Sequence, residues 1–476
     1  MIPNLYRHTK IIITLGPATL DEAVFRKLLL LGLDIVRLNM AHASKEWTEM
    51  ATEMVRRVSK SVGRDVAILM DIKGPEVRTG DVSDTLQLEE GEVFDFYVST
   101  EAQARNAGNG IRSTTVNYPG LMNDVKVGDT MLVDSGLIRM QVQDVTPERL
   151  RCGVLIPGPL GKRRHINLPG VKVNLPSLTE KDKRDVLTGI ACGVDFYALS
   201  FVREGSDLDL LRRFMSDNGS QAPIIAKIED QSAVTNLSEI IRAADGLMVA
   251  RGDLGIEVPF EKLPIIQRRI VNACIAAGKP VIVATHMLES MITQPMPTRA
   301  EITDVANAVF EQADCVMLSA ETTVGKYPVE CVEVLNRIIG ECEQAYDTYI
   351  SPFKPKTPKG KLLSAAATLA TELQDAAIVV FTRQGTLARS LSALRPWHVP
   401  IYAFTDVKGT FSELLITWGV EPFLMEFSDE PEKTVQDAIA YLKRRNWVKQ
   451  GTPLVFITNV LAGELKVDTV QLRWVE

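Results

Sequence analysis

Several features that would place this chain at a membrane or on nucleic acid are missing from its 476 residues. No apolar run is long enough to span a bilayer, and the start, Met1-Ile2-Pro3-Asn4, lacks the charged-then-apolar pattern of a signal peptide. The net charge is -7, and no long basic run offers a surface to nucleic acid or anionic lipid. We therefore expect a cytoplasmic protein with no membrane and no nucleic acid among its partners.

Close cysteine pairs and the two common phosphate cradles are also missing. The six cysteines, at positions 152, 192, 274, 315, 331 and 342, show no CxxC spacing and are typical of reduced cytosolic residues. Neither a G-x-x-x-x-G-K-[ST] loop nor a G-x-G-x-x-G after a strand occurs. A nucleotide that binds here must therefore bind without either standard cradle.

What the chain does have is eight short apolar runs, each of which ends in a polar or charged residue. Buried parallel strands have this appearance, and nearly all the runs are followed by a helical pattern. The predicted strands are 11–14, 35–39, 67–71, 196–200, 224–229, 247–251, 281–285 and 316–319. Eight such units predict a (β/α)8 TIM barrel with its active site at the carboxyl ends of the strands. The alternative is an open α/β sheet with incidental polar caps.

Helix punctuation supports the first of these units. Thr19 and Glu22 stand three apart, which predicts a capping box at the start of the first helix. Gly32 stands where a left-handed residue would end that helix. Strand, helix and strand are therefore expected within the first forty residues.

Two interruptions divide the chain into domains. Between 74 and 168 the alternation stops, and short β-prone runs predict an inserted all-β domain that would hang over the catalytic face as a lid. A proline- and lysine-rich linker at 351–360 follows the barrel. We predict a catalytic barrel at 1–73 and 169–345, the lid at 74–168, and a C-terminal α/β domain with a mainly parallel sheet at 346–476.

Ionisable side chains gather at the ends of the fifth and sixth predicted strands. Lys227 and Glu229 stand two apart on one strand, so an ammonium and a carboxylate point together into the barrel mouth. Asp253 adds a carboxylate at the end of the neighbouring strand. Two carboxylates with few histidines nearby suit a hard divalent cation, Mg2+ or Mn2+. A structural ion pair between Lys227 and Glu229 is the alternative.

Positive charge is predicted around the same mouth. The cations are Arg37, Lys73, Arg78 and Lys227. The turn at Gly252 offers backbone N–H groups to an anion, although a plain tight turn explains the glycine equally well. Together with two metal-binding carboxylates, these groups describe a site for a small, multiply anionic, phosphorylated substrate.

Six segments resemble the signature segments of pyruvate kinase, in the same order along the barrel. They are Arg37–Asn39, Asp71–Gly80, Ile225–Glu229, Met248–Gly255, Ala284–Met291 and Pro297–Glu301. The inserted and C-terminal domains also fall where that family carries them. The resemblance implies transfer of the phosphoryl group of phosphoenolpyruvate to ADP, which gives ATP and, after protonation of the enolate, pyruvate.

The resemblance also implies roles for individual residues. Glu229 and Asp253 would ligate Mg2+, and Lys227 would neutralise the phosphoryl group as it moves. Arg37 would hold the transferred phosphoryl group. Thr285 would help to pass a proton to the methylene carbon.

The remaining substrate contacts follow from the same resemblance. The backbone around Gly252 and Asp253 would hold the substrate carboxylate, and the lid would close to exclude water. His286 stands where the family has glutamine, which bears on the surroundings of the proton relay. His42 is equally well explained as a solvated loop residue. The positions that match nucleotide contacts are Thr14, Pro17, His42, Arg78 and Arg164.

Two further departures bear on a monovalent-cation site. Ala41 and Ile72 stand where the family usually has serine and threonine. The ligands that remain are Asn39, Asp71 and the backbone carbonyl of Ile72. Cation-independent members tend to carry lysine at the position of Glu76, so the negative charge here favours a bound cation. We expect K+ to activate the enzyme through a weakened site.

A second ligand site is predicted in the last domain. Thr382, Arg383, Gln384, Gly385 and Thr386 follow a strand and open a helix, a setting for a phosphate, and the family's allosteric sugar phosphates bind at the matching loop. Gln384 and Leu387 stand where bisphosphate-responsive members usually offer hydroxyls. We therefore expect a monophosphate effector or none. Residues 298–301 match a subunit-contact region, so the resemblance implies a homotetramer.

Two other functions stay open at this point. A Mg2+-dependent enolate lyase or aldolase on the same barrel would share Glu229, Arg251 and Asp253 but would need neither the lid nor the segment 71–80. A catalytically silent, metabolite-sensing barrel follows if the departures disable the site. An assay with phosphoenolpyruvate, ADP and Mg2+ separates all three functions.

Overall fold

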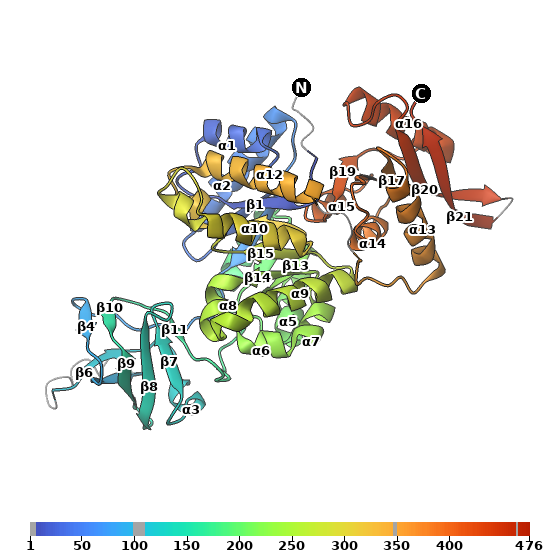
Figure 1. Cartoon of the computed structure of the whole chain (residues 1–476). Helices are drawn as coiled ribbons and strands as arrows, with labels where there is room; N and C mark the ends of the chain where they lie inside the picture. The colour runs from blue at the N-terminus through green and yellow to red at the C-terminus, as the bar shows by residue number, and fades with distance from the viewer. Residues whose placement is uncertain (1–5, 99–109, 346–349, 463–464) are drawn as a thin grey trace.

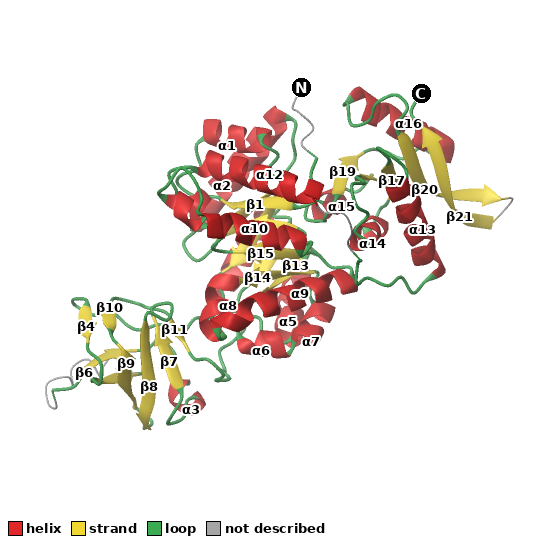
Figure 2. Cartoon of the chain, viewed as in Figure 1, coloured by secondary structure: helices red, strands yellow, loops and turns green. Residues whose placement is uncertain are grey.

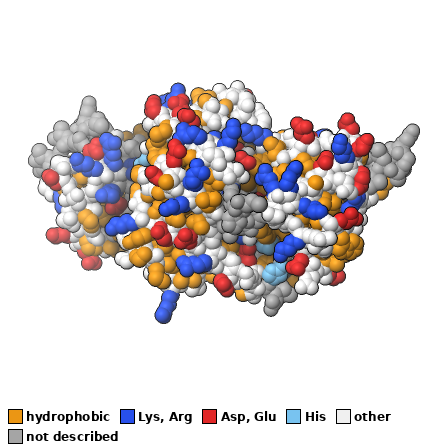
Figure 3. Space-filling model, turned by 90° about the horizontal axis from the view of Figure 1, so that it is seen from above, with side chains coloured by type: hydrophobic (Ala, Val, Ile, Leu, Met, Phe, Trp, Pro, Cys, Tyr) orange, Lys and Arg blue, Asp and Glu red, His pale blue; other side chains and the backbone are white. Residues whose placement is uncertain are grey.

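The computed structural model describes residues 6–98, 110–345, 350–462 and 465–476, which form a central barrel with a domain on either side (Figure 1). Figure 2 shows that the inserted domain is built mainly of strands, whereas helices and strands alternate in the other two. Acidic and basic side chains are interspersed over the face seen in Figure 3. No helix in the described ranges is long and apolar enough to cross a membrane.

Eight parallel strands close into a barrel in the order β1-β16-β15-β14-β13-β12-β3-β2. They are β1 (Lys10–Thr14), β2 (Ile35–Asn39), β3 (Ala67–Ile72), β12 (Phe196–Leu199), β13 (Ile224–Ile228), β14 (Gly246–Ala250), β15 (Val281–Ala284) and β16 (Cys315–Met317). Every predicted strand is present, with ends within two residues of those expected. The closed order confirms the barrel and excludes the open sheet.

Helices pack around the outside of these strands. They are α1 (Glu22–Leu30), α2 (Lys45–Val62), α4 (Glu180–Cys192), α5 (Gly205–Asp217), α6 (Gln231–Thr235), α7 (Leu237–Ala243), α8 (Arg251–Glu257), α9 (Leu263–Ala277), α10 (Arg299–Phe310), α11 (Ala320–Thr323) and α12 (Pro328–Ala345). Two short 3-10 turns, Phe260–Lys262 and Glu289–Ile292, lie between them.

The predicted capping box of the first helix is wrong. Asp21 is the N-cap of α1, and its carboxylate accepts hydrogen bonds from the backbone N–H groups of Ala23 and Val24. Thr19 instead donates to the carbonyl of Thr322, which ties the loop after β1 to α11. Gly32 does have the expected positive φ, at 85°.

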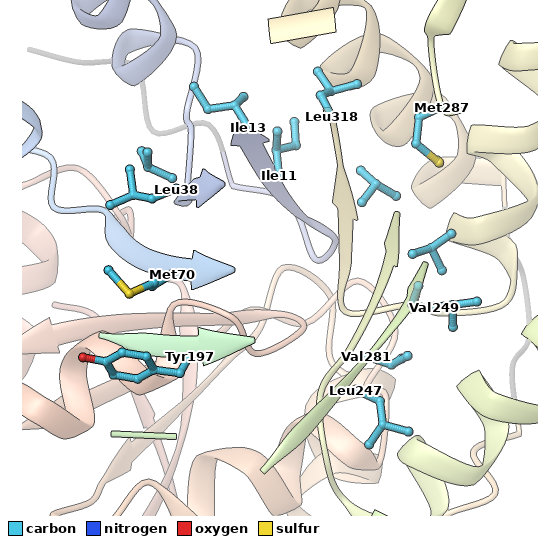
Figure 4. Packing of buried hydrophobic residues seen from close by; sticks show 14 of the residues in the cluster. Ile11, Ile13, Leu38, Met70, Tyr197, Leu247, Val249, Val281, Met287 and Leu318 are labelled. Atoms are coloured by element: carbon cyan, nitrogen blue, oxygen red, sulfur yellow. The ribbon is translucent and has the colours of Figure 1, made fainter. Parts of the chain in front are cut away.

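Alternating side chains of the barrel strands divide the apolar core into two clusters. Ile11 and Ile13 point outward into the cluster between strands and helices, part of which is shown in Figure 4. Ile12 points inward and packs with Phe196 and Met248 in the barrel interior. The interior is therefore filled by side chains, and a ligand can approach only at an end.

The C-terminal domain closes the amino end of the barrel. Leu415 and Ile416 pack into the interior cluster, and the carbonyl of Ile416 lies 3.4 Å from Sγ of Cys315. Arg395 of the same domain forms a buried ion pair with Asp314, just before β16, at 3.0 Å. Only the carboxyl end of the barrel stays open for catalysis.

The inserted domain has its own sheet and its own core. A six-stranded sheet runs in the order β11-β7-β8-β9-β5-β6, and β10 pairs with β4 separately. Phe94, Phe96 and Met131 belong to a buried cluster formed within this domain and its connection to the barrel. The elements are β4 (Leu86–Leu88), β5 (Val93–Tyr97), β6 (Arg112–Thr115), α3 (Leu121–Asp124), β7 (Thr130–Val133), β8 (Ile138–Val145), β9 (Arg149–Ile156), β10 (Gly158–Leu160) and β11 (Ile166–Asn167).

The C-terminal domain is a five-stranded sheet in the order β19-β18-β17-β20-β21, parallel except for the pair β20 and β21. Its elements are α13 (Pro358–Glu372), β17 (Ala377–Phe381), α14 (Thr386–Ala393), β18 (Ile401–Thr405), α15 (Lys408–Leu414), β19 (Val420–Leu424), α16 (Pro431–Arg444), β20 (Pro453–Ala462) and β21 (Leu465–Trp474). The mainly parallel sheet was expected. The edge strands β19 and β21 were not, because β19 contains Pro422 and β21 alternates polar with apolar residues.

Candidate active site

Lys227, at the end of β13, lies in the middle of a cluster of buried charge at the open end of the barrel. Its Nζ lies 2.8 Å from Oε1 of Glu229 and 3.2 Å from Oδ1 of Asp71. The ammonium also donates a hydrogen bond of 2.7 Å to Oγ of Ser200. Lys227 is 9% exposed and Glu229 1%. Partners from three neighbouring strand ends thus fix the position of the Lys227 ammonium.

Arg37 extends this cluster toward the first strand. Its Nε and Nη2 each lie 2.7 Å from Oδ2 of Asp71, and its Nη1 donates to Oγ1 of Thr14 at 2.9 Å. The Thr14 hydroxyl in turn donates to the carbonyl of Leu318. The guanidinium plane is therefore held on two sides, with Asp71 shared between Arg37 and Lys227.

The pKa shifts of the cluster separate its two acids. Burial opposes ionisation of Asp71, but Lys227 and Arg37 outweigh it and lower the pKa of that carboxyl. Burial also opposes the charge of Lys227, yet Asp71 and Glu229 raise the pKa of the ammonium above its usual range. For Glu229 the balance is reversed: burial raises its pKa, Lys227 lowers it, and Asp253 raises it further. Burial is the largest of these causes, so a further positive charge beside Glu229 would favour its ionised form.

Few described groups contact the Glu229 carboxylate directly. Its Oε2 accepts from the backbone N–H of Phe201 at 2.6 Å. Its Oε1 lies 2.8 Å from Nζ of Lys227 as an ion pair and has no other partner among the described residues. No group of three His, Cys, Asp or Glu side chains suited to a metal occurs in the described part of the chain. A cation here would thus have two protein carboxylates, Glu229 and Asp253, and would complete its shell with water and substrate oxygens, as Mg2+ does.

A strained turn faces these carboxylates from the end of β15. Thr285 and His286 have φ of 67° and 54°, values that non-glycine residues rarely adopt. Oγ1 of Thr285 accepts a hydrogen bond from the backbone N–H of Gly252 at 2.8 Å and donates to the carbonyl of Ala284 at 2.6 Å. The Thr285 hydroxyl is thereby fixed beside the Gly252–Asp253 turn.

Arg251 supports this turn instead of facing the mouth. Its guanidinium donates to the carbonyls of Ala284 and Thr285 and pairs with Asp304 at 2.7 Å. It is only 6% exposed. Its part in the site is therefore structural.

Comparisons with known proteins agree with this geometry. A family model described as the pyruvate kinase barrel domain matches residues 6–332, and one for the pyruvate kinase alpha/beta domain matches residues 361–472. The chain belongs to the pyruvate kinase family.

Individual relatives cover nearly all of the chain. A pyruvate kinase of Dictyostelium discoideum is 39% identical over 476 residues, 97% of this chain and 92% of that protein. Plastidial pyruvate kinase 3 of Arabidopsis thaliana is 38% identical over 95% of this chain and 78% of its own length. The crystal structure of a pyruvate kinase from Cryptosporidium parvum, 33% identical, has a TM-score of 0.91 and covers 99% of this chain and 96% of that one.

Membership in the pyruvate kinase family confirms the predicted activity. The chain is a phosphotransferase that moves the phosphoryl group of phosphoenolpyruvate to ADP and produces pyruvate and ATP. The family implies these substrates and a divalent metal. The lyase or aldolase and the silent sensor considered from the sequence are therefore set aside.

The residues that match nucleotide contacts in pyruvate kinases lie on both sides of the mouth. Pro17 and His42 are exposed on the loops after β1 and β2, whereas Thr14 is buried beneath Arg37. In the inserted domain, Arg78 pairs with Glu76 at 2.7 Å, and Arg164 pairs with Asp134 at 3.3 Å. The barrel and the inserted domain thus both contribute to the predicted nucleotide site.

The candidate ligands for a monovalent cation all have partners within the chain. Oδ1 of Asn39 accepts from the backbone N–H of Ala41 at 3.1 Å, and the carbonyl of Ile72 accepts from Ser200 at 2.7 Å. The Asp71 carboxylate is engaged by Arg37 and Lys227. A bound K+ would therefore share or replace existing hydrogen bonds.

The predicted effector loop of the C-terminal domain lies between β17 and α14, as expected. Gly385 has a φ of 70° and is the N-cap of α14. Arg383 pairs with Asp406 at 2.8 Å, and Thr382 is buried. The carbonyl of Gln384 accepts from Arg389 at 2.8 Å. These contacts fix the conformation of the loop, and they do not identify a ligand for it.

One member of the cluster, Ser200, received no role from the sequence. It bridges Lys227 and the carbonyl of Ile72, and it lies 3.3 Å from Oδ1 of Asp71. Its only sequence signal is its place at the end of the predicted strand 196–200. That place predicts convergence at the mouth but not the partner.

Proposed function

We propose that the cluster around Lys227 carries out the phosphoryl transfer, with Glu229 and Asp253 as the ligands of the divalent metal. The observation that carries this assignment is the buried Glu229 carboxylate, whose pKa is raised by burial and by the nearby Asp253 even though its Oε1 is paired with Lys227 at 2.8 Å. A buried acid in this state gains most from a nearby cation. Mg2+ or Mn2+ bound there would draw charge from the substrate oxygens.

Lys227 and Arg37 handle the phosphoryl group. As the bond between phosphorus and the enol oxygen of phosphoenolpyruvate breaks, the phosphoryl group passes to a terminal phosphate oxygen of ADP, and negative charge develops on the enolate. The fixed Lys227 ammonium neutralises that charge without reorganisation during the reaction. Arg37, held by Asp71 and Thr14, keeps the phosphoryl group in line.

Thr285 and the neighbouring turn complete the chemistry. The backbone of Gly252 and Asp253 holds the substrate carboxylate. The Thr285 hydroxyl, fixed beside that turn, helps to pass a proton to the methylene carbon and so converts enolate to pyruvate. The strain at Thr285 and His286 is consistent with a turn selected for function over stability.

The inserted domain acts as a lid over the nucleotide. Thr14, Pro17, His42, Arg78 and Arg164 are the proposed contacts of ADP and ATP, and closure of the lid excludes water from the transfer. We propose the domain bounds 1–73 with 169–345 for the barrel, 74–168 for the lid and 346–476 for the C-terminal domain.

Regulation and assembly follow the family by analogy. K+ would bind at Asn39, Asp71 and the carbonyl of Ile72, and a phosphorylated effector would bind at the loop 382–386. The protein would act as a homotetramer in the cytoplasm, with residues 298–301 near a subunit contact. Relatives also include plastidial enzymes, so localisation of a tagged full chain is the direct test.

Pyruvate formation from phosphoenolpyruvate and ADP by the purified protein tests the assignment. We expect activity with Mg2+ or Mn2+ that disappears on chelation and returns when the metal is restored. Full activity after exhaustive metal removal would contradict the metal site.

A further inference from the structure

The inserted domain contacts the barrel at the carboxyl end of α8. Nδ2 of Asn167, on β11, donates a hydrogen bond of 2.9 Å to Oε1 of Glu257. A Cβ placed on Gly136, in the turn between β7 and β8, would lie 3.6 Å from Cγ2 of Ile256. Glu257 therefore contacts one segment of the inserted domain, and the adjacent Ile256 lies close to a second.

The other end of α8 belongs to the active site. Asp253 lies one turn before Glu257 on the same helix, which places the two about 6 Å apart along its axis. Nε2 of Gln231, two residues beyond Glu229, donates to the backbone carbonyl of Glu257 at 2.8 Å. The inserted domain therefore contacts the helix that carries Asp253, and the same end of that helix is bonded to Gln231, close in sequence to Glu229.

We propose that Asn167 and Glu257 form a latch that holds the lid in register with the metal-binding turn, and that both are positioning residues for transfer to ADP. This inference rests on the proposed roles of Glu229 and Asp253. Both residues line the same cavity as Glu229, and their proposed role is to position the lid. They determine the position in which the lid presents its nucleotide-binding residues.

Electrostatics favours Glu257 as the fixed half of the latch. The pKa of Glu257 is raised to about 7: burial raises it most, Asp230 and Asp253 add to the shift, and the hydrogen bonds from Asn167 and the backbone of Leu168 oppose it. A carboxylate in such surroundings gains more from a donor than an exposed one would. The Asn167 amide is therefore a matched partner for it.

Asn167 is the residue of this pair that can break the hydrogen bond. Its Oδ1 is buried and accepts no hydrogen bond from the described part of the chain, so the amide is only half satisfied where it lies. The latch consists of the Asn167–Glu257 hydrogen bond, and the backbone of the adjacent Leu168 also engages the Glu257 carboxylate. Such a contact can open and close in each turnover as nucleotide enters and leaves.

An exchange of isosteric side chains tests the latch. In Asn167→Asp the amide donor is lost and Glu257 can bond to the new carboxylate only as a protonated acid, whereas Glu257→Gln keeps the shape of the acceptor but removes its charge. In the double variant N167D/E257Q the Gln amide donates to the Asp carboxylate, so the bond is restored in the opposite direction. Each protein is assayed for kcat and KM with ADP and with phosphoenolpyruvate. Solvent exchange of the methyl protons of pyruvate, a reaction of the barrel site alone, is measured alongside, as is the thermal unfolding midpoint.

We expect Asn167→Asp to lower kcat/KM for ADP by about tenfold or more, with proton exchange within about twofold of the parent. The double variant should recover most of that loss, because only a direct pair is rescued by exchange. Parental kinetics in Asn167→Asp, equal loss of proton exchange, or a double variant no better than Asn167→Asp would overturn the latch. Absence of Mg2+-dependent exchange in the parent protein would instead refute the proposed active site, so the two failures are distinguishable.

Discussion

Two clusters of buried charge occupy opposite ends of the same barrel. At the amino end, Asp34 is surrounded by Arg7, Lys10 and Arg64, and Lys10 also lies 3.7 Å from Glu421 of the C-terminal domain. Burial opposes ionisation of Asp34, yet the three cations lower its pKa. The C-terminal domain covers this cluster, so it is complete within the folded chain.

The cluster at the carboxyl end also has one aspartate paired with cations, but it contains further carboxylates. Asp71 is paired with Arg37 and Lys227, and its pKa is also lowered. Two more carboxylates, Glu229 and Asp253, then join the same group, and the pKa of Glu229 is raised.

The comparison shows what distinguishes a structural ion cluster from a catalytic one. Three cations contact Asp34 at the amino end, whereas at the mouth the Lys227 ammonium is shared between Asp71 and Glu229. The imbalance leaves room for a cation from outside the chain, next to a lysine that cannot lose its proton at neutral pH. Burial and the presence of ion pairs are common to both ends and do not discriminate between them.

The strongest test of the difference between the two clusters is to replace the lysine in each. Lys227→Met should lower turnover by several orders of magnitude while phosphoenolpyruvate affinity changes by about tenfold or less, because the charge acts mainly in the transition state. Lys10→Met should keep turnover within about twofold and lower the unfolding midpoint, since it leaves Asp34 and Glu421 undercompensated. Steady-state kinetics and thermal unfolding of both variants decide. Equal losses of turnover at the two ends would remove the distinction.

Removing one acid from each end is the next test. Glu229→Gln or Asp253→Asn weakens one ligand of a hard cation, so the Mg2+ concentration for half-maximal activity should rise by about tenfold or more. Glu421→Gln at the amino end is the matched control and should leave the Mg2+ titration unchanged. If titrations of all three variants overlay that of the parent, the metal assignment is wrong.

The contrast also explains which parts of the molecule can be predicted from sequence. The barrel strands are continuous apolar runs, and the two-residue spacing of Lys227 and Glu229 puts both side chains on one face whatever the rest of the fold does. The N-cap of α1 is less determined: Thr19 and Glu22 have the spacing of a capping box, yet Asp21 caps the helix and Thr19 bonds to Thr322 in the distant helix α11. Local patterns thus specify elements better than their ends.

Contacts between distant segments leave no local trace. Arg251 stands beside Asp253 in the sequence, yet its guanidinium turns to Asp304 and the carbonyl of Ala284, so nearness in sequence overstated its part in the mouth. Asn167 and Glu257 are 90 positions apart and meet only once the inserted domain returns to the barrel. Such pairings depend on tertiary packing and cannot be read from spacing.

A smaller effect is expected in the acid stability of the amino-end cluster. Because the folded pKa of Asp34 lies below its unfolded value of about 3.9, its ionisation stabilises the fold above that pH, and the stabilisation is lost as pH falls through the folded pKa. Asp34→Asn should therefore unfold at a lower temperature than the parent at pH 7, with a difference that shrinks below about pH 4. Asp81→Asn, at an exposed and solvent-screened pair with Arg163, should show a much smaller difference. If the difference in unfolding temperature between Asp34→Asn and the parent is constant with pH, ionisation of Asp34 does not contribute to the stability of the fold.

The smallest expected effect concerns K+, which would add a second external cation beside Asp71. Glu76, whose charge favoured that cation in the sequence, is paired with Lys73 at 3.1 Å and Arg78 at 2.7 Å, so it contributes less negative potential than its charge suggests. Asn39, Asp71 and the carbonyl of Ile72 remain, without a hydroxyl at Ala41. We expect K+ to activate the enzyme and to half-saturate at a concentration a few-fold higher than in Ala41→Ser, which restores an oxygen ligand.

Assays in tetramethylammonium buffer with graded KCl measure this, and Ala41→Gly serves as the control, since it alters the same position without adding a hydroxyl. Half-saturation in Ala41→Gly should stay near that of the parent. Identical titrations for Ala41→Ser and the parent would show that position 41 does not face the cation. Full activity without K+ would show that Arg37 and Lys227 alone balance Asp71, as the cations around Asp34 do at the other end of the barrel.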